Sequence, residues 1–256
     1  MREDRNRSWA AAAGKARPFR LGARLQRGAL ALMLDPMSAF RRWLERRRRH
    51  RQWESRWRRD DFAPRWGDRG TPPEIVASAD AGWFPATGTM LDVGCGQGEI
   101  AGWFAERGYR CVALDVSESA VRRARARHAH VAERIEFVAR DVCAAPPPDR
   151  SYDVVVDRGC LHQIPLHEVG SYVRHVTGVA GPRARFLLFI KAFRDGAPFD
   201  DPAERAQRTR WVEDAFAGAF VLERVESTYL DAWHGELPDR RLPGMVFWMT
   251  RAGAPA

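Results

Sequence analysis

Three glycines at alternate positions, directly after a short apolar run, mark the first place where the chain could bind a ligand. They are Gly94, Gly96 and Gly98, within the stretch LDVGCGQGEI at 91–100. Glycine lets a backbone approach a ligand closely, and such a turn between a strand and a helix often binds a dinucleotide. A dinucleotide fingerprint, however, needs a third glycine where this chain has Glu99. A carboxylate in the first turn of a helix repels a pyrophosphate and accepts a cationic ligand.

Polar residues after the neighbouring apolar runs suit the nucleoside part of such a ligand. Asp115 closes the run VALD, where a carboxylate can accept hydrogen bonds from both hydroxyls of a ribose. Asp141 and Val142 follow the next run, and form a polar–apolar pair suited to the edge and the face of an adenine. Asp92, near the end of the first run, adds negative charge beside the glycines. Ribose, adenine, positive charge and no phosphate together describe S-adenosylmethionine.

The same motifs resemble those of class I S-adenosylmethionine-dependent methyltransferases. They read LDVGCGQGE, LDVS and ARDV, and the resemblance extends over residues 88–251. It implies that the 94–98 loop contacts the methionine part of the cofactor, Asp115 the ribose, and Asp141 with Val142 the adenine. The predicted cofactor-binding residues are Asp92, Gly94, Cys95, Gly96, Gly98, Asp115, Val116, Asp141, Val142, Asp157, Trp53, Trp57 and Trp66.

Two further stretches are similar to the thiopurine and thiol methyltransferase group. They are WESRWRRDDFAPRWGDRGTPPEIV at 53–76 and VVDRGCLHQIP at 155–165. Members of that group have a tryptophan-rich N-terminal lid, and an Asp-Arg-Gly sequence after the fourth strand whose arginine, here Arg158, faces the substrate. This chain departs from the pattern by an inserted glycine, Gly67, after Trp66. The resemblance favours a sulfur or other chalcogen atom as methyl acceptor.

The predicted catalytic residues, Arg158, His162 and Asp157, follow the fourth apolar run. Arg158 could bind an anionic or polar acceptor, or pair with Asp157 or a neighbouring helix. His162 could deprotonate an acceptor, because an unperturbed histidine has a pKa of about 6.5, or it could hydrogen-bond the backbone. An acidic thiol needs no strong base, whereas oxygen and nitrogen acceptors more often do. No Cys/His spacing suggests a metal, and we expect none.

Regular alternation of apolar runs with helical patterns predicts the elements that position these residues. Continuous Val/Ile/Leu runs between helices are typical of a parallel sheet covered on both faces, with ligands at the carboxyl ends of its strands. Two last runs without a helix between them predict an antiparallel hairpin. We therefore predict an α/β fold, a doubly wound, Rossmann-like, seven-stranded and mostly parallel sheet with an antiparallel C-terminal hairpin strand. The predicted strands are 89–93, 110–116, 135–139, 152–157, 184–193, 219–230 and 244–251, and the helices 98–108, 117–129 and 165–179.

Basic charge is concentrated at the start of the chain. The net charge is +9, of which residues 1–70 contribute +12 and residues 71–256 contribute −3. The high isoelectric point therefore does not indicate a nucleic-acid-binding protein as a whole. We predict a basic, disordered extension at 1–36, a Trp/Arg-rich helical lid at 37–87 with a helix at 37–62, and the methyltransferase domain at 88–256. Trp53, Trp57 and Trp66 could cover the cofactor, whose sulfonium an aromatic face attracts, or fasten the N-terminal helix.

The remaining sequence features limit the function classes. No apolar run approaches the roughly 20 residues that cross a bilayer, and the four cysteines show no disulfide framework. We expect a cytoplasmic enzyme, a monomer or homodimer, with a small-molecule acceptor and no nucleic acid partner. Two alternatives stay open. One is an N-, O- or C-methyltransferase of a secondary metabolite, and the other is a non-catalytic cofactor-binding protein whose basic head holds nucleic acid or membrane.

Overall fold

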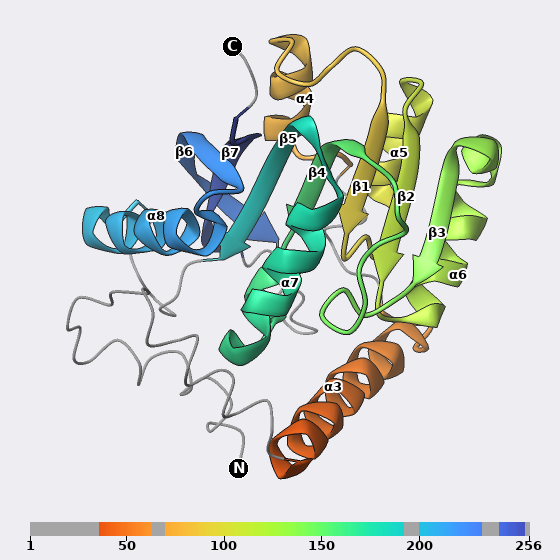
Figure 1. Cartoon of the computed structure of the whole chain (residues 1–256). Coiled ribbons are helices and arrows are strands. Elements are labelled where there is room, and N and C mark those ends of the chain that lie inside the picture. Colours follow the sequence, from red (N-terminus) through yellow and green to blue (C-terminus); the bar gives the residue numbers. More distant parts are fainter. Residues whose placement is uncertain (1–35, 63–69, 192–199, 232–240, 254–256) are drawn as a thin grey trace.

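The computed structural model describes residues 36–62, 70–191, 200–231 and 241–253. Within these residues, seven strands form one sheet in the order β3-β2-β1-β4-β5-β7-β6 (Figure 1). Strands β1 to β5 run parallel, and β7 pairs antiparallel with both β5 and β6. The predicted α/β fold, with its antiparallel C-terminal strands, is confirmed. The strands are β1 Thr89–Val93, β2 Arg110–Asp115, β3 Ile135–Ala139, β4 Tyr152–Arg158, β5 Ala180–Lys191, β6 Phe220–Asp231 and β7 Arg241–Arg251.

The strand order reverses between β1 and β4, which are neighbours in the sheet. Ligands of open α/β sheets bind outside the carboxyl ends of the strands at such a reversal. Asp92 on β1 is in register with Val156 on β4, so the ends of these two strands reach the same edge. The glycine loop after β1 and the turn that begins at Gly159 after β4 therefore lie next to each other there.

Two hydrophobic clusters cover the two faces of the sheet. One face packs against α4 (Pro73–Asp80), α5 (Glu99–Glu106) and α6 (Glu118–Arg127). The other packs against α7 (Leu166–Val179) and α8 (Pro202–Phe216) (Figure 1). Buried strand residues alternate between the faces, as a covered parallel sheet requires. On β4, for example, Val155 belongs to the second cluster while Val154 and Val156 belong to the first.

The N-terminal helix α3 spans Pro36–Trp57, and so ends five residues before the predicted bound of 62. It lies across the edge of the sheet toward which the arrowheads of β2 and β3 point (Figure 1). Trp57 and Phe62 are buried and pack with Ala120 of α6. Their rings meet edge to face with centroids 4.9 Å apart, a favourable aromatic geometry. Trp57 thus fastens α3 to the domain.

Helix α8 was not predicted, because its buried stripe is half charged. The buried positions are four residues apart and comprise Glu204, Arg208, Val212 and Phe216. Arg208 Nη2 donates to Glu204 at 2.8 Å within this stripe, so apolar periodicity is weak although the stripe faces the core. The start of the helix did carry a sequence signal. Asp201 caps it by accepting from two backbone N–H groups, and Pro202 occupies the first turn.

Several predictions fall outside the described residues. They concern the extension at 1–35, Trp66, and the end of the predicted fifth strand at 192–193. The division into lid and domain at residue 87 stays a prediction. Among the described helices, none combines the length and apolarity that crossing a membrane requires.

Replacing Ser78 should destabilise the fold, because its hydroxyl accepts a hydrogen bond from a buried indole. Trp248 Nε1 on β7 donates to Ser78 Oγ at 2.8 Å, and Ser78 Oγ donates to the carbonyl of Glu74 at 2.6 Å. Ser78→Ala leaves the buried Trp248 N–H without this acceptor, and should lower the free energy of unfolding by about 1–3 kcal/mol in urea titrations. The exposed Ser55 offers a matched control, and Ser55→Ala should change it by less than about 0.5 kcal/mol. Equal effects of the two substitutions would contradict the expectation.

Candidate active site

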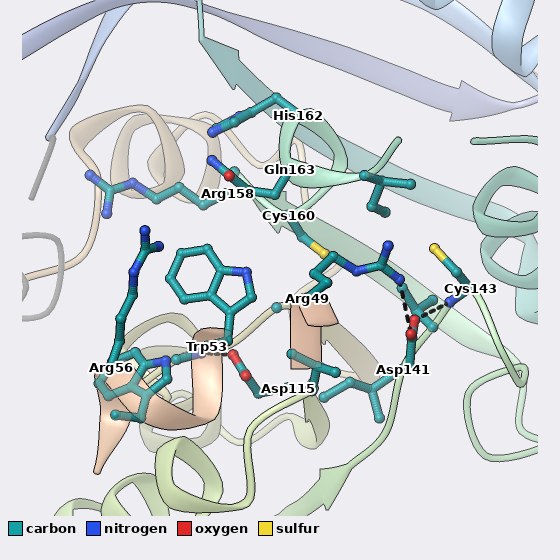
Figure 2. Close-up of a pocket in the computed structure, with 18 of the residues that line it drawn as sticks. Arg49, Trp53, Arg56, Asp115, Asp141, Cys143, Arg158, Cys160, His162 and Gln163 are labelled. Atoms are coloured by element: carbon teal, nitrogen blue, oxygen red, sulfur yellow. Dashed lines mark hydrogen bonds and ion pairs between the residues drawn. The ribbon is translucent and has the colours of Figure 1, made fainter. Parts of the chain in front are cut away.

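A cavity of about 400 Å³ lies between the carboxyl ends of the parallel strands and α3 (Figure 2). This volume is in the range of small-molecule sites. The structure brings residues from the glycine loop, from the ends of β2 and β4, and from α3 around one space, although they are far apart in the sequence. The predicted site residues that line it are Trp53, Trp57, Gly94, Gly96, Asp115, Val116, Asp141, Val142, Arg158 and His162.

The glycine loop is bonded to the neighbouring strand and crossed by the turn after β4. The backbone N–H groups of Gly94 and Cys95 both donate to the carbonyl of Leu114 at 2.8 Å. Gly94 has φ +77°, and an added Cβ would lie 2.6 Å from the Cβ of Cys160. Glycine is therefore required at 94 both by its backbone conformation and by this close approach. Cys95 is not among the residues that line the cavity.

Gly98 serves packing rather than the cavity. It precedes α5 in the left-handed conformation, with φ +77°. A Cβ at this position would lie 2.7 Å from the Phe137 ring of β3, and Gly98 does not line the cavity. Gly98 thus lets the start of α5 approach the sheet, a packing role like that of the third glycine in dinucleotide-binding folds, although it lies one position earlier.

Asp115 at the end of β2 has the geometry of a ribose ligand. Its Oδ2 accepts from the N–H of Gly96 at 2.9 Å, and its Oδ1 accepts from the N–H of Ser117 at 2.9 Å. These bonds fix the carboxylate, while each oxygen keeps a further lone pair for a hydroxyl donor. Burial raises the pKa of Asp115 to about 6, against the effect of the backbone hydrogen bonds from Ser117 and Gly96.

Two more buried carboxylates support the walls of the site. Asp92 accepts from the N–H of Ala101 in α5, and Asp157 accepts from the Tyr172 hydroxyl at 2.5 Å and from two N–H groups of the following turn. Neither is among the residues that line the cavity, and Asp157 holds the turn that follows Arg158 through the N–H groups of Cys160 and Leu161. Burial raises the pKa of Asp92 to about 7 and that of Asp157 to about 6. Because these carboxylates and Asp115 are costly to ionise in isolation, a cationic ligand nearby would stabilise their charged forms.

Glu99 contributes less negative charge to the cavity than its sequence position suggests. It lies in the first turn of α5, and its Oε2 is 3.1 Å from Arg127 Nη2 in an ion pair. It is not among the residues that line the cavity. The preference for a cationic ligand therefore depends on the buried aspartates.

Asp141 lines the cavity and is held by two donors. Its Oδ1 accepts from the N–H of Cys143 at 2.9 Å, and its Oδ2 accepts from Arg49 Nη2 at 2.9 Å (Figure 2). Arg49 belongs to α3, and sequence analysis did not identify it as a site residue. The part of the cavity next to Asp141 is thus formed partly by the N-terminal helix.

One face of α3 forms a wall of the cavity. It carries Arg49, Trp53, Arg56 and Trp57, which are spaced as neighbours on a helical surface. The Trp53 indole points into the cavity, and the Arg56 guanidinium carbon lies 4.7 Å from the centroid of this ring (Figure 2). Sequence analysis found the tryptophans and missed the arginines. The available signal was their helical spacing from Trp53, which the general abundance of arginine concealed.

His162 and Arg158 line the cavity together with Lys191 at the end of β5. The N–H of Lys191 donates to His162 Nδ1 at 3.4 Å. Burial, followed by the nearby positive charges of Lys191 and Arg208, lowers the pKa of His162 to about 3. The imidazole is therefore neutral and a weak base at neutral pH. In the described part of the chain, no cluster of three or more His, Cys, Asp or Glu residues could hold a metal ion.

Comparisons with known proteins show a methyltransferase domain in this chain. A family described as a methyltransferase domain matches residues 90–183. The 2-heptyl-1-hydroxyquinolin-4(1H)-one methyltransferase of Mycobacteroides abscessus is 27% identical over 131 residues. That alignment covers 50% of this chain and 56% of the relative, so it spans little more than half of the relative's length.

Two solved structures share the fold. The N-methyltransferase NodS of Bradyrhizobium japonicum, in complex with S-adenosyl-L-homocysteine, has a TM-score of 0.55 and 16% identity, covering 80% of this chain and 98% of that one. A structure from work on the conversion of a disulfide bond into a thioacetal group during echinomycin biosynthesis has a TM-score of 0.57 and 20% identity, covering 74% and 85%. Residues 90–183 thus match a methyltransferase domain, and the described part of the chain has the fold of these two structures.

Proposed function

We propose that the protein transfers the methyl group of S-adenosylmethionine to a small-molecule acceptor, and that this acceptor is a thiol or another chalcogen nucleophile. The observation that carries the proposal is that one cavity holds carboxylates beside the glycine loop and cations at the ends of β4 and β5. Asp115 and Asp141 line the part that we assign to the cofactor, the cofactor side, and Arg158 and Lys191 line the part that we assign to the acceptor, the acceptor side. The lining also includes Arg49, Arg56 and Arg140. A cationic methyl donor and an anionic acceptor would each meet complementary charge there.

Each residue on the cofactor side would contact one part of S-adenosylmethionine. Asp115 offers one free acceptor position per oxygen to the ribose hydroxyls, and Asp141 with Val142 faces the adenine. Gly94 and Gly96 leave room for the methionine part. When bound, S-adenosylmethionine supplies a methyl group on a positively charged sulfur. Holding an acceptor in line with that methyl can supply about 7–11 kcal/mol of the rate enhancement through proximity and orientation.

The acceptor side favours a nucleophile that needs little deprotonation by the protein. His162, the predicted base, is neutral with a pKa of about 3, and Asp157 lies behind the cavity wall. A thiol that is partly ionised near neutral pH reacts without a strong base. Arg158 and Lys191 would stabilise its anion, and Trp53 and Trp57 help to exclude water from it. A dry pocket favours the neutralisation of opposite charges during transfer.

An oxygen or nitrogen acceptor is the second candidate function. The similarity to a hydroxyquinolone methyltransferase favours a heteroaromatic acceptor of this kind. Such an acceptor would bind in the same cavity, and its acidity would then decide how much the weak basicity of His162 limits the rate.

The first test is release of S-adenosylhomocysteine by the purified protein with a panel of acceptors. The panel contains aromatic thiols, hydrosulfide, selenite, tellurite, halides, phenols, hydroxyquinolones and amines. We expect release with thiols or other chalcogen compounds, because these ionise without help from His162. Release with phenols, hydroxyquinolones or amines alone would replace the chalcogen assignment by the second candidate. Failure of the protein to bind S-adenosylhomocysteine at all would reject both.

Cofactor affinity should fall at acidic pH. Protonation of Asp115, with its pKa of about 6, removes the charged acceptor of the ribose hydroxyls. Because the ligand prefers the ionised form, the affinity for S-adenosylhomocysteine measured by calorimetry should be highest above pH 7 and decrease toward pH 5. Asp115→Asn should weaken binding by about 10- to 150-fold and reduce the pH dependence, since hydrogen bonds to charged groups contribute about 1.5–3 kcal/mol. An unchanged affinity between pH 5 and 8 would contradict this role.

Arg158 should affect the acceptor more than the cofactor. Arg158→Met removes a cation from the acceptor side, and should raise the KM of an anionic acceptor about tenfold or more. The KM of S-adenosylmethionine should change less than about twofold, because the carboxylates of the cofactor side stay in place. The control is Arg183→Met, an exposed arginine at the opposite end of β5 from Lys191. Equal changes in both KM values would place Arg158 outside the acceptor side.

A further inference from the structure

Helix α3 lines the cavity, and it also forms hydrogen bonds with the residues that would bind the nucleoside. We propose that Arg49 and Glu54 of α3 are positioning residues that hold Asp141 and the Asp115–Ser117 segment in the arrangement to which adenosine binds. The inference rests on the proposed cofactor. It assigns to the N-terminal helix a direct effect on cofactor affinity, which a lid over the acceptor alone would not have.

Arg49 links three elements at the adenine side. Its Nη2 donates to Asp141 after β3 at 2.9 Å, and its Nη1 donates to Glu168 in the first turn of α7 at 2.7 Å. Glu168 is only 1% exposed and also pairs with Arg46. A buried carboxylate of this kind requires cationic partners, so the pairs keep α3 in a defined position.

The bond from Arg49 determines how Asp141 faces the cavity. One oxygen of Asp141 is bound to Arg49 and the other to the N–H of Cys143, which prevents the carboxylate from rotating. Figure 2 shows Arg49 reaching Asp141 across the cavity wall. Without Arg49, Asp141 would lose its cation and could turn toward water. The adenine would then meet a carboxylate without a fixed orientation.

Glu54 fixes the segment next to the proposed ribose site by accepting hydrogen bonds from Ser117 and Ser119. Its Oε2 accepts from the Ser117 hydroxyl at 2.6 Å and from the N–H of Ser119 at 3.1 Å, and its Oε1 accepts from the Ser119 hydroxyl at 2.6 Å. Burial alone would raise the pKa of Glu54, but the hydrogen bonds from Ser117, Ser119 and Arg58 lower it to about 2. Glu54 is therefore ionised at neutral pH. Its negative charge lies at the N-terminus of α6, where the helix dipole favours it.

The contacts of Glu54 continue directly to the ribose ligand. Ser117 donates its hydroxyl to Glu54 and its backbone N–H to Asp115 Oδ1 at 2.9 Å. Fixing the Ser117 side chain thus helps to fix the Asp115 carboxylate. Arg49 and Glu54 are five residues apart on one helix, with Trp53 between them on the cavity wall. Docking of α3 therefore acts on both ends of the nucleoside at once.

The test measures the affinity of Arg49→Met and Glu54→Gln for two probes, S-adenosylhomocysteine and 5′-methylthioadenosine, by calorimetry. Each substitution should weaken the binding of both probes by a similar factor of about tenfold or more, because both carry the adenosine that the contacts position. Matched controls on the same helix are Arg47→Met and Glu45→Gln, whose partners Trp43 and His167 lie outside the cavity lining. The controls should change affinity less than about twofold.

A double substitution separates positioning from general stability. If Arg49 acts through Asp141, adding Arg49→Met to an Asp141→Asn protein should weaken binding less than about threefold. A purely structural role would lower the melting temperature and leave the affinity of the folded protein unchanged. If Arg49→Met does not fold, Arg49→Lys keeps the charge but loses the two-pronged geometry, and should still weaken binding by about three- to tenfold.

The outcomes distinguish the two proposals. Wild-type protein that binds the probes, with variants that fold and bind equally well, would overturn the role of α3 alone. The role of α3 would also be overturned if Arg49→Met weakened binding by the same factor in the Asp141→Asn protein as in the otherwise wild-type protein. Arg49 would then not act through Asp141. Wild-type protein that binds neither probe would overturn the proposed function, and the inference with it.

Discussion

The carboxylate of Asp115 joins the parts of the chain from which the cofactor site is built. One oxygen holds the glycine loop through Gly96, and the other holds the start of α6 through Ser117. Burying a carboxylate in this way is unfavourable unless hydrogen bonds satisfy it, and both bonds come from backbone N–H groups that the fold places at the end of β2. The parallel arrangement of β1, β2 and β4 brings the loop, Asp115 and Arg158 at the end of β4 to one edge of the sheet.

Charge is distributed unevenly around this edge. The aspartates near the glycine loop are buried and have raised pKa values, whereas Arg158 and Lys191 line the acceptor side. A positively charged methyl donor and an anionic acceptor would each meet charge of the opposite sign in this cavity. This complementarity is the physical basis of the proposed reaction, and it requires no strong base.

Helix α3 gives the site its second wall. Glu168 is buried, so it stabilises the fold only while Arg46 and Arg49 neutralise it. The same Arg49 donates to Asp141, and Glu54 accepts from Ser117, so contacts of the docked helix reach the proposed nucleoside site. Buried Trp57 adds an apolar anchor beside them. Docking of the helix and order in the site are therefore properties of one network.

Sequence alone was sufficient for the sheet, because seven apolar runs are separated by helical patterns or loops, and the last two runs have no helix between them. It also placed Arg158 and the tryptophans of α3 near the cavity. It did not reveal α8, whose buried stripe contains an ion pair. It also did not distinguish residues that line the cavity from Gly98 and Asp157, which support its walls. It missed Arg49 and Glu54 among many similar residues. Periodicity and motifs report how each segment is buried, whereas the partner of each charged group depends on segments that are distant in the chain. The tertiary structure alone decides that Arg49 meets Asp141 and that Glu54 meets Ser117.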